Sequence, residues 1–184
     1  MTTSSQPATG NAVLQRLRAG EFAGTWVLDP TRSSVGLRSR SMWGMVPING
    51  SFAVVSGAGT VSASGDVGGT LEVNADSIDT KNQKRDKHLK SADFFHTDKH
   101  SLIVFTARRV RSDGAGLVIE GMLQVRDIAR PIDIPVRLSA SGDEIVQLDT
   151  KITIDRSQYG LTWNQMGMAS MTSVIDVRAV FVRR

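Results

Sequence analysis

The sequence predicts an all-β protein, folded as an antiparallel sandwich or a closed barrel of about eight strands. Two observations lead to this prediction. From Thr25 onward, apolar residues recur at every second position, as in strands that have one face in a core and one in water. Short turn signals rich in Gly, Asp and Ser separate these runs, as expected for hairpins between antiparallel strands. The turn signals lie at 56–59, 65–66, 68–69, 113–114 and 141–143.

The alternation is strictest in the C-terminal half of the chain. There, every second residue is apolar through most of 132–138, 146–154 and 175–181. Shorter runs of the same kind lie at 35–37, 71–75, 103–105 and 117–125. In the run at 132–138, Pro131 and Pro135 both occupy the face opposite to the apolar residues. Because proline has no backbone N–H, we predict that this strand lies at a seam or rim of the sheet.

One short helix is expected inside the β pattern, over 82–91. Asn82 can cap its N-terminus, and Leu89 is expected to face inward among solvated lysines and arginines.

The first twenty residues differ from the rest. Met1–Gly10 consists mostly of Thr, Ser, Pro and Gly and is expected to be flexible. Val13, Leu14 and Leu17 then fall at helical spacing, and Gly20 closes the segment. We therefore predict a flexible leader with a short amphipathic helix over 1–20, docking on the domain or on a partner. One barrel domain follows over 21–184.

Composition argues against several classes of function. The 184 residues carry a formal charge of +4, but the basic residues are scattered, and the 5% of aromatics form no stacking platform for nucleic acid. Cysteine is absent, which excludes disulfides, thiolate metal sites and cysteine nucleophiles. No apolar run approaches the ~18 residues of a transmembrane helix. No signal peptide pattern opens the chain, so the expected location is the cytoplasm.

Ordered motifs run from Thr25 to Phe181. They read TWVLDP at 25–30, SSV at 33–35, GSF at 50–52, SIDTKN at 77–82, RDKHLKSADFF at 85–95, GML at 121–123, RPI at 130–132 and IDRSQYGLTW at 154–163. With these motifs the chain resembles the YceI family of polyisoprenoid-binding, lipocalin-like proteins. A further segment, SRSMWG at 39–44, looks like a cytoplasmic, actinobacterial-type branch of that family.

The resemblance implies an extended antiparallel, lipocalin-like barrel around a long apolar channel. In the family this channel holds an amphiphile with a polyprenyl or similar tail, and dimers are common. The expected partner is therefore an apolar amphiphilic small molecule, and a homodimer is implied by the resemblance alone.

Residue size bears on whether such a channel is open. Small residues in the inward-facing set leave volume, and methionine suits irregular or mobile apolar ligands. The small residues are Ala75, Ala107, Gly121, Thr150 and Ala179. The alternative is an ordinary filled core. With the resemblance, we predict a lipid pocket instead. Its expected lining is Leu37, Trp43, Met45, Phe52, Ile78, Leu89, Phe94, Phe95, Phe105, Leu123, Leu161, Trp163, Met166 and Met168.

A headgroup site is expected at the mouth of the pocket. Arg38, Arg40 or Arg85 could meet a phosphate there. The alternation along this strand places Arg38 and Arg40 on its outward face, so the alternative is that both are surface charges.

All three histidines of the chain, His88, His96 and His100, lie in one segment together with Asp86, Asp93 and Asp98. Such a segment could bind a metal or supply a general base. The histidines lack the i, i+4 spacing of a helical zinc pair, and neighbouring lysines repel a cation. We predict no metal site, no catalytic residue and no cofactor beyond a bound polyprenyl lipid or quinone. The pair Asp155–Arg156 is interpreted as fixing a turn.

The sequence thus predicts a cytoplasmic barrel that binds an isoprenoid lipid, quinone or similar long-chain amphiphile as a carrier or reservoir, without catalysis. One alternative is an enzyme that acts on such a lipid through the His88, His96 and His100 region. Another is a structural interaction module with a filled barrel.

Overall fold

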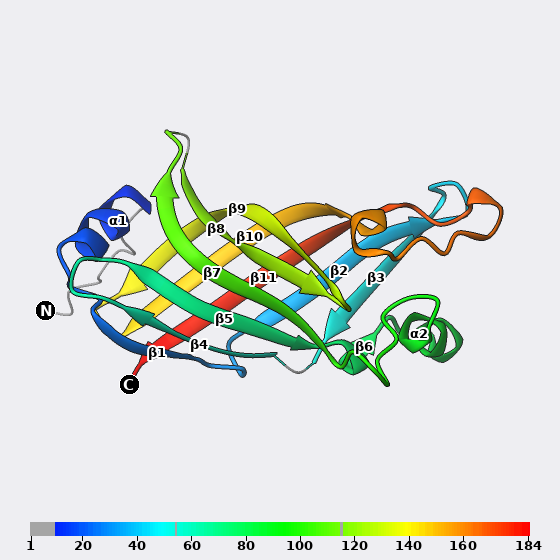
Figure 1. The fold of residues 1–184 in the computed structure, drawn as a ribbon, viewed down its shortest axis with the longest axis horizontal. Coiled ribbons are helices and arrows are strands. Elements are labelled where there is room, and N and C mark those ends of the chain that lie inside the picture. The colour runs from blue at the N-terminus through cyan, green and yellow to red at the C-terminus, as the bar shows by residue number, and fades with distance from the viewer. Residues whose placement is uncertain (1–9, 54, 115) are drawn as a thin grey trace, which may run out of the picture.

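Two helices lie at opposite ends of an antiparallel barrel in the computed structural model (Figure 1), which describes residues 10–53, 55–114 and 116–184. They are α1 (Gly10–Arg18) and α2 (Gln83–Lys90). The strands are β1 (Gly24–Leu28), β2 (Ser34–Ser41), β3 (Val46–Phe52), β4 (Val55–Val61), β5 (Val67–Asn74), β6 (Ile78–Asp79), β7 (Leu102–Ser112), β8 (Leu117–Val125), β9 (Ile128–Ser141), β10 (Ile145–Asp155) and β11 (Thr172–Arg183). The described residues also form three 3-10 turns: η1 (Ala75–Ser77), η2 (Arg156–Tyr159) and η3 (Gln165–Gly167).

The barrel closes because β1 pairs on both of its edges, with β4 and with β11. The closed ring runs β1-β4-β5-β7-β8-β9-β10-β11. Beyond the segment paired to β1, β11 pairs with β2 through residues 174–178, and β3 and β6 extend the sheet from there. The predicted all-β antiparallel barrel of about eight strands is confirmed, and closure decides against an open sandwich.

The two prolines of β9 lie where that strand has one partner. Pro131 and Pro135 pair with Met122 and Val118 of β8, whereas β10 pairs with β9 only from Arg137 onward. The missing N–H groups therefore fall at a local seam, as the sequence predicts.

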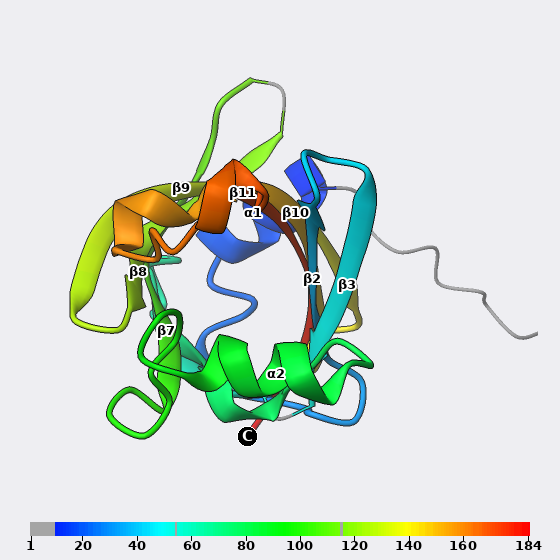
Figure 2. The same ribbon diagram turned by 90° about the vertical axis from the view of Figure 1, so that its right-hand side faces the viewer.

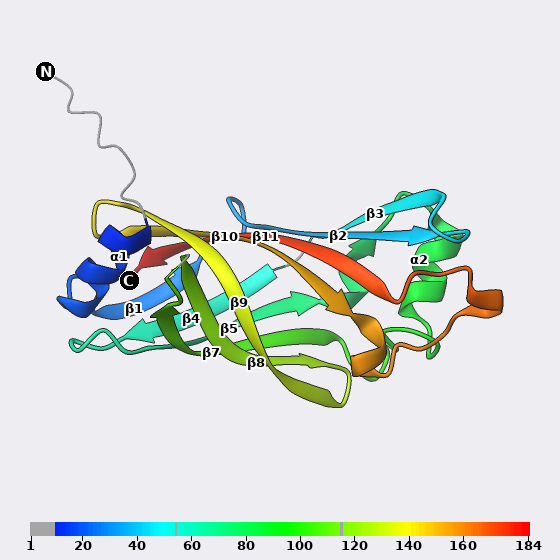
Figure 3. The same cartoon turned by 90° about the horizontal axis from the view of Figure 1, so that it is seen from above.

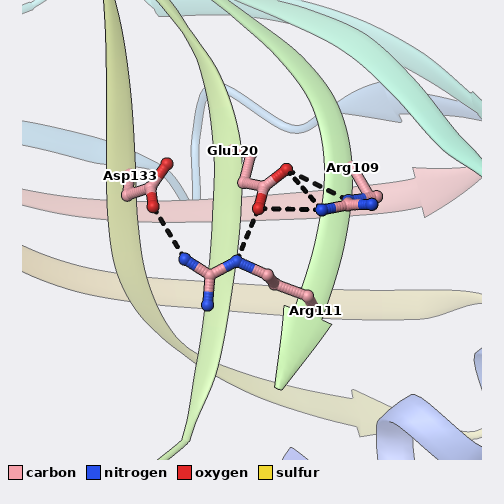
Figure 4. Close-up of polar contacts among 4 residues, drawn as sticks. All are labelled: Arg109, Arg111, Glu120 and Asp133. Carbon is pink, nitrogen blue, oxygen red and sulfur yellow. Dashed lines mark hydrogen bonds and ion pairs between the residues drawn. The ribbon is translucent and has the colours of Figure 1, made fainter. Parts of the chain in front are cut away.

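Four charged side chains tie β7, β8 and β9 together (Figure 4). Glu120 accepts from Arg109 Nε at 3.0 Å and from Arg111 Nε at 2.5 Å, and Arg111 Nη2 donates to Asp133 at 2.7 Å. These bonds lower the pKa of Glu120. The group lies beside the irregular register between Ala107 and Arg109, where cross-strand pairs help to fix the pairing.

The predicted N-terminal helix forms and docks on the barrel. Val13, Leu14 and Leu17 are buried in a cluster with Phe22 and Trp26. The Trp26 indole also donates to the carbonyl of Phe22 at 2.8 Å. Of the segment expected to be flexible, Met1–Gly10, residues 1–9 lie outside the described residues, whereas Gly10 begins α1. The division of the chain at residue 20 stays a prediction.

The predicted internal helix also forms, and Figure 2 shows α2 lying across one end of the barrel. The Asn82 side chain caps it by accepting from Arg85 N at 3.0 Å. Asp86 accepts from Thr80 N at 2.9 Å, and Arg85 Nη2 donates to Thr80 O at 2.9 Å. The helix is thus anchored to the residue that follows β6.

Candidate functional site

The barrel encloses a cavity of about 1060 Å³. Its walls are mainly aliphatic and aromatic side chains from the inward faces of the strands. The lining extends from Val13 and Trp26 at the α1 end to Arg85 and His88 at the α2 end. Sites for drug-sized ligands have volumes of about 300–1,000 Å³, so this cavity has room for a larger or longer molecule.

Some of the small residues expected to leave volume do border the cavity. Ala107, Thr150 and Ala179 are in its lining, whereas Ala75 and Gly121 are not. At Gly121 the ring of Phe105 occupies the space, because an added Cβ would lie 2.6 Å from Phe105 Cζ.

Most of the predicted pocket residues lie on the cavity wall. They are Leu37, Phe52, Leu89, Phe94, Phe95, Phe105, Leu123, Leu161 and Trp163. The remaining five do not line it. Ile78 is buried in the surrounding core, and Met168 lies at the end of η3. Trp43, Met45 and Met166 are exposed on loops beside the cavity. Alternation assigns faces within strands but not in loops, so the sequence does not reveal that these loop side chains point away from the cavity.

The charged residues of the lining are confined to the α2 end, which we call the mouth. Five are cationic and one is anionic. They are Arg40, Lys84, Arg85, Lys87, Arg156 and Asp93. At the opposite end the lining residues Val13, Leu17, Phe22 and Trp26 are buried, so α1 seals the barrel there.

The three arginines proposed for a headgroup have different positions. Arg40 and Arg85 line the mouth. Arg38 is not in the lining and forms an ion pair with Asp176 of the neighbouring strand β11. Arg40 donates to the carbonyl of Gly44 at 3.1 Å, within the β2–β3 hairpin.

Arg156 binds the backbone of the loop at one side of the mouth, a role that the sequence does not indicate. Its side chain is buried and donates to the carbonyls of Ser170 at 2.8 Å, Trp163 at 2.9 Å and Leu161. Burial lowers the pKa of this guanidinium. The expected turn is present as well, because Asp155 caps η2 by accepting from Ser157 N at 2.9 Å. No local pattern reveals the carbonyls that Arg156 meets, since they belong to the following loop.

Of the three histidines, His88 alone lines the cavity. Its Nε2 lies 3.0 Å from Asp93 Oδ2, and its ring stands edge-on to Trp163 with the ring centroids 4.4 Å apart. His96 and His100 lie against each other, with ring centroids 5.8 Å apart. Within residues 10–53, 55–114 and 116–184, no cluster of three or more His, Asp or Glu side chains is arranged to hold a metal ion.

A closed antiparallel barrel of eight strands around an apolar cavity defines a lipocalin-like barrel. In the described part of the chain, no helix has both the length and the apolar character needed to cross a membrane. The chain belongs to the YceI-like domain family, whose sequence model matches residues 26–181.

Individual relatives match over a shorter stretch than the family model does, or over most of the chain at an identity of 18% or 19%. Protein YceI of Escherichia coli (strain UMN026) is 38% identical over 74 residues, which are 40% of this chain and 39% of that protein. Two solved structures have the same fold. BcnA of Burkholderia cenocepacia is 19% identical, with a TM-score of 0.74 over 83% of this chain and 98% of its own. A polyisoprenoid-binding domain from Saccharophagus degradans is 18% identical, with a TM-score of 0.70 over 86% and 98%.

Proposed function

We propose that this protein binds an isoprenoid lipid, a quinone or a similar long-chain amphiphile inside the barrel, as a carrier or reservoir and without catalysis. One observation carries the proposal: an apolar cavity of about 1060 Å³ runs from a sealed end at α1 to a charged mouth at α2. Such a cavity suits a molecule with a long apolar tail and one polar end. The family and the polyisoprenoid-binding domain of similar fold support the same interpretation.

Burial of the tail supplies enough free energy for tight binding. Large ligands gain about 0.3 kcal/mol per non-hydrogen atom, so a tail of about forty carbons would contribute about 12 kcal/mol. That free energy corresponds to a nanomolar dissociation constant. No catalytic group is needed for this function.

The polar end of the ligand is proposed to lie at the mouth. Arg40, Lys84 and Arg85 reach this end of the cavity, and the single carboxylate in the lining, Asp93, is next to His88. The excess of positive charge favours an anionic headgroup such as a phosphate. Arg38 has no place in this site because its guanidinium pairs with Asp176.

A second candidate function rests on the His88–Asp93 pair. A histidine oriented by a carboxylate at 3.0 Å and facing a ligand cavity is an arrangement that can serve as a general base. An enzyme acting on the lipid would lose turnover in His88→Ala but keep it in His96→Ala, because His96 does not line the cavity. A carrier would keep its ligand in both variants.

The proposal is tested by native mass spectrometry of the freshly purified protein, followed by organic extraction and mass analysis of the lipid. A bound mass equal to a prenyl lipid or quinone is expected, and it should be lost in Leu148→Trp, which adds a ring inside the cavity. Leu102→Trp is the matched control, because Leu102 is exposed and does not line the cavity. A protein that carries no ligand and takes up neither polyprenyl phosphate nor quinone would refute the carrier function.

Two finer expectations accompany this proposal. The native mass also reports whether the protein is a homodimer, and cell fractionation reports whether it is cytoplasmic. Neither result changes the argument for lipid binding.

A further inference from the structure

Large apolar side chains are exposed on two loops beside the mouth. Among the described residues, the exposed large hydrophobics other than Leu102 all lie in the β2–β3 hairpin or in η3. They are Met42, Trp43, Met45, Val46 and Met166, which we call the apolar rim. Trp43 is 64% exposed, Met45 71% and Met166 78%. Apolar side chains gathered in this way on a protein surface mark an interaction site.

The two loops form one surface. Trp43 N donates to Met168 O at 3.2 Å, and Ser170 N donates to Arg40 O at 2.9 Å. Figures 1 and 3 show both loops at the α2 end, with the η3 loop projecting farthest along the barrel axis. The apolar rim therefore stands at the entrance to the cavity rather than on the wall.

The backbone of the rim is held in an uncommon conformation. Met42, Trp43 and Met166 have φ values of 50°, 56° and 55°, in the left-handed region that glycine adopts most readily. All three side chains are exposed, so burial of apolar surface does not offset the cost of this backbone conformation. Backbone strain retained at an exposed site is typical of functional positions.

Unpaired positive charge borders the rim. Within the described part of the chain, Arg40, Lys84 and Lys87 form no ion pair, whereas Lys81 is paired with Asp79 at 2.5 Å. Lys90, at the end of the same helix, lies 3.6 Å from Asp76. Of the described residues, Asp86 and Asp98 in the same part of the chain also have no ion pair, but Lys84, Arg85, Lys87 and Lys99 outnumber them, so the unpaired charge at this end is positive in net.

We propose that the apolar rim inserts into the interface of an anionic lipid bilayer, with Arg40, Lys84 and Lys87 against the headgroups and the mouth facing the membrane. Tryptophan favours the headgroup level of a bilayer, and lysine and arginine are attracted by anionic lipid. A protein partner would also accept the apolar rim, but the unpaired cations favour an anionic surface. Docking goes beyond the proposed lipid binding and gives a lipid a path into the cavity that avoids water.

The first test is co-sedimentation of the full chain with vesicles of phosphatidylcholine, with and without phosphatidylglycerol. We expect binding that requires phosphatidylglycerol and weakens at high salt. In Lys84→Glu/Lys87→Glu the affinity should fall about tenfold or more, because each basic residue near an anionic surface contributes about fivefold or more to binding. The matched control is Arg18→Glu/Arg137→Glu, the same change of charge on α1 and β9, which should stay within about twofold of the wild type.

A second measurement tests insertion directly, in the wild-type protein. Bromine-labelled lipid should quench the fluorescence of Trp43, and the quenching should be lost in Trp43→Phe, because Trp26 is buried and Trp163 faces the cavity. Equal binding to both kinds of vesicle, equal loss in the two charge variants, or no quenching of Trp43 would each overturn the proposal. Since quenching and salt dependence use the wild type, a variant that fails to fold does not remove the test.

Uptake of a polyprenol from solution, measured without vesicles, separates the two proposals. Protein that takes up polyprenol but does not sediment with phosphatidylglycerol vesicles would refute docking and leave lipid binding standing. Protein that sediments with these vesicles but takes up no polyprenol would refute lipid binding inside the barrel and leave docking standing.

Discussion

The guanidinium of Arg156 donates a hydrogen bond of 2.9 Å from Nη2 to the backbone carbonyl of Trp163, and this contact holds one side of the mouth in place. The same side chain reaches the carbonyls of Ser170 and Leu161, and its Cζ lies 5.4 Å from the centre of the Phe94 ring. A buried arginine is usually paired with a carboxylate. Here, loop carbonyls satisfy it instead, so the charge organises the segment between 161 and 170.

Replacing Arg156 by Met should therefore loosen the mouth. The change removes three hydrogen bonds and leaves carbonyls without their donor, which should lower the free energy of unfolding by about 2–4 kcal/mol. Chemical denaturation measures the loss, and amide hydrogen exchange should rise within 161–170. Arg178→Met is the control, because Arg178 pairs with Asp149 on the exposed wall and should cost less than about 1 kcal/mol. Equal losses in the two variants would contradict the role given to Arg156.

Gly121 should not tolerate even a methyl group. A Cβ there would lie 2.4 Å from Thr106 O and 2.6 Å from Phe105 Cζ, so the strand pairing or the ring must move. We expect Gly121→Ala to destabilise the protein by about 1–3 kcal/mol in thermal or chemical unfolding. Gly68→Ala serves as the control, since a Cβ at Gly68 meets nothing within 4 Å. A Gly121→Ala protein as stable as the control would show that the approach of Phe105 is not tight.

Leu17 joins α1 to the sealed end of the cavity. Its side chain is buried and forms part of the cavity lining. Leu17→Ala should lower the free energy of unfolding by about 2–5 kcal/mol, as for other buried leucines. Amide exchange of α1 should also increase. Gln15→Ala, an exposed site on the same helix, should change neither quantity, and a matching effect there would point to helix propensity rather than packing.

Asp29 makes stability depend on pH at the corner between β1 and β2. Hydrogen bonds from the Thr31 side chain and from Arg32 lower the pKa of this carboxyl from 3.8 to about 2. Because the pKa is lower in the folded protein, the carboxylate stabilises fully above pH 3.8 and loses its contribution as the pH falls towards 2. Wild type should be more stable than Asp29→Asn near neutral pH.

The gap between wild type and Asp29→Asn should close in acid, as measured by denaturant unfolding across that pH range. Thr31→Ala removes the largest cause of the shift and should reduce the pH dependence. A gap that stays constant down to pH 2 would rule out Asp29 as its source.

Local sequence patterns determined much of the architecture. Period-two alternation predicts the strands because the pleat sends successive side chains to opposite faces. Asn82 predicts the start of α2 through its side-chain cap. Val13, Leu14 and Leu17 predict a helix with one buried face, and the motifs between Thr25 and Phe181 indicate the family.

Only the tertiary structure decided what the inward faces enclose. Alternation shows that Leu37 and Phe105 point inward, but whether they meet side chains or a cavity depends on strands that are distant in sequence. Trp43 and Met166 have a left-handed backbone and lie exposed outside the barrel, although their apolar character alone suggests that they belong to a core. Arg156 meets its carbonyls only once the loop between β10 and β11 has folded. In each case the deciding contact joins residues that no local periodicity relates.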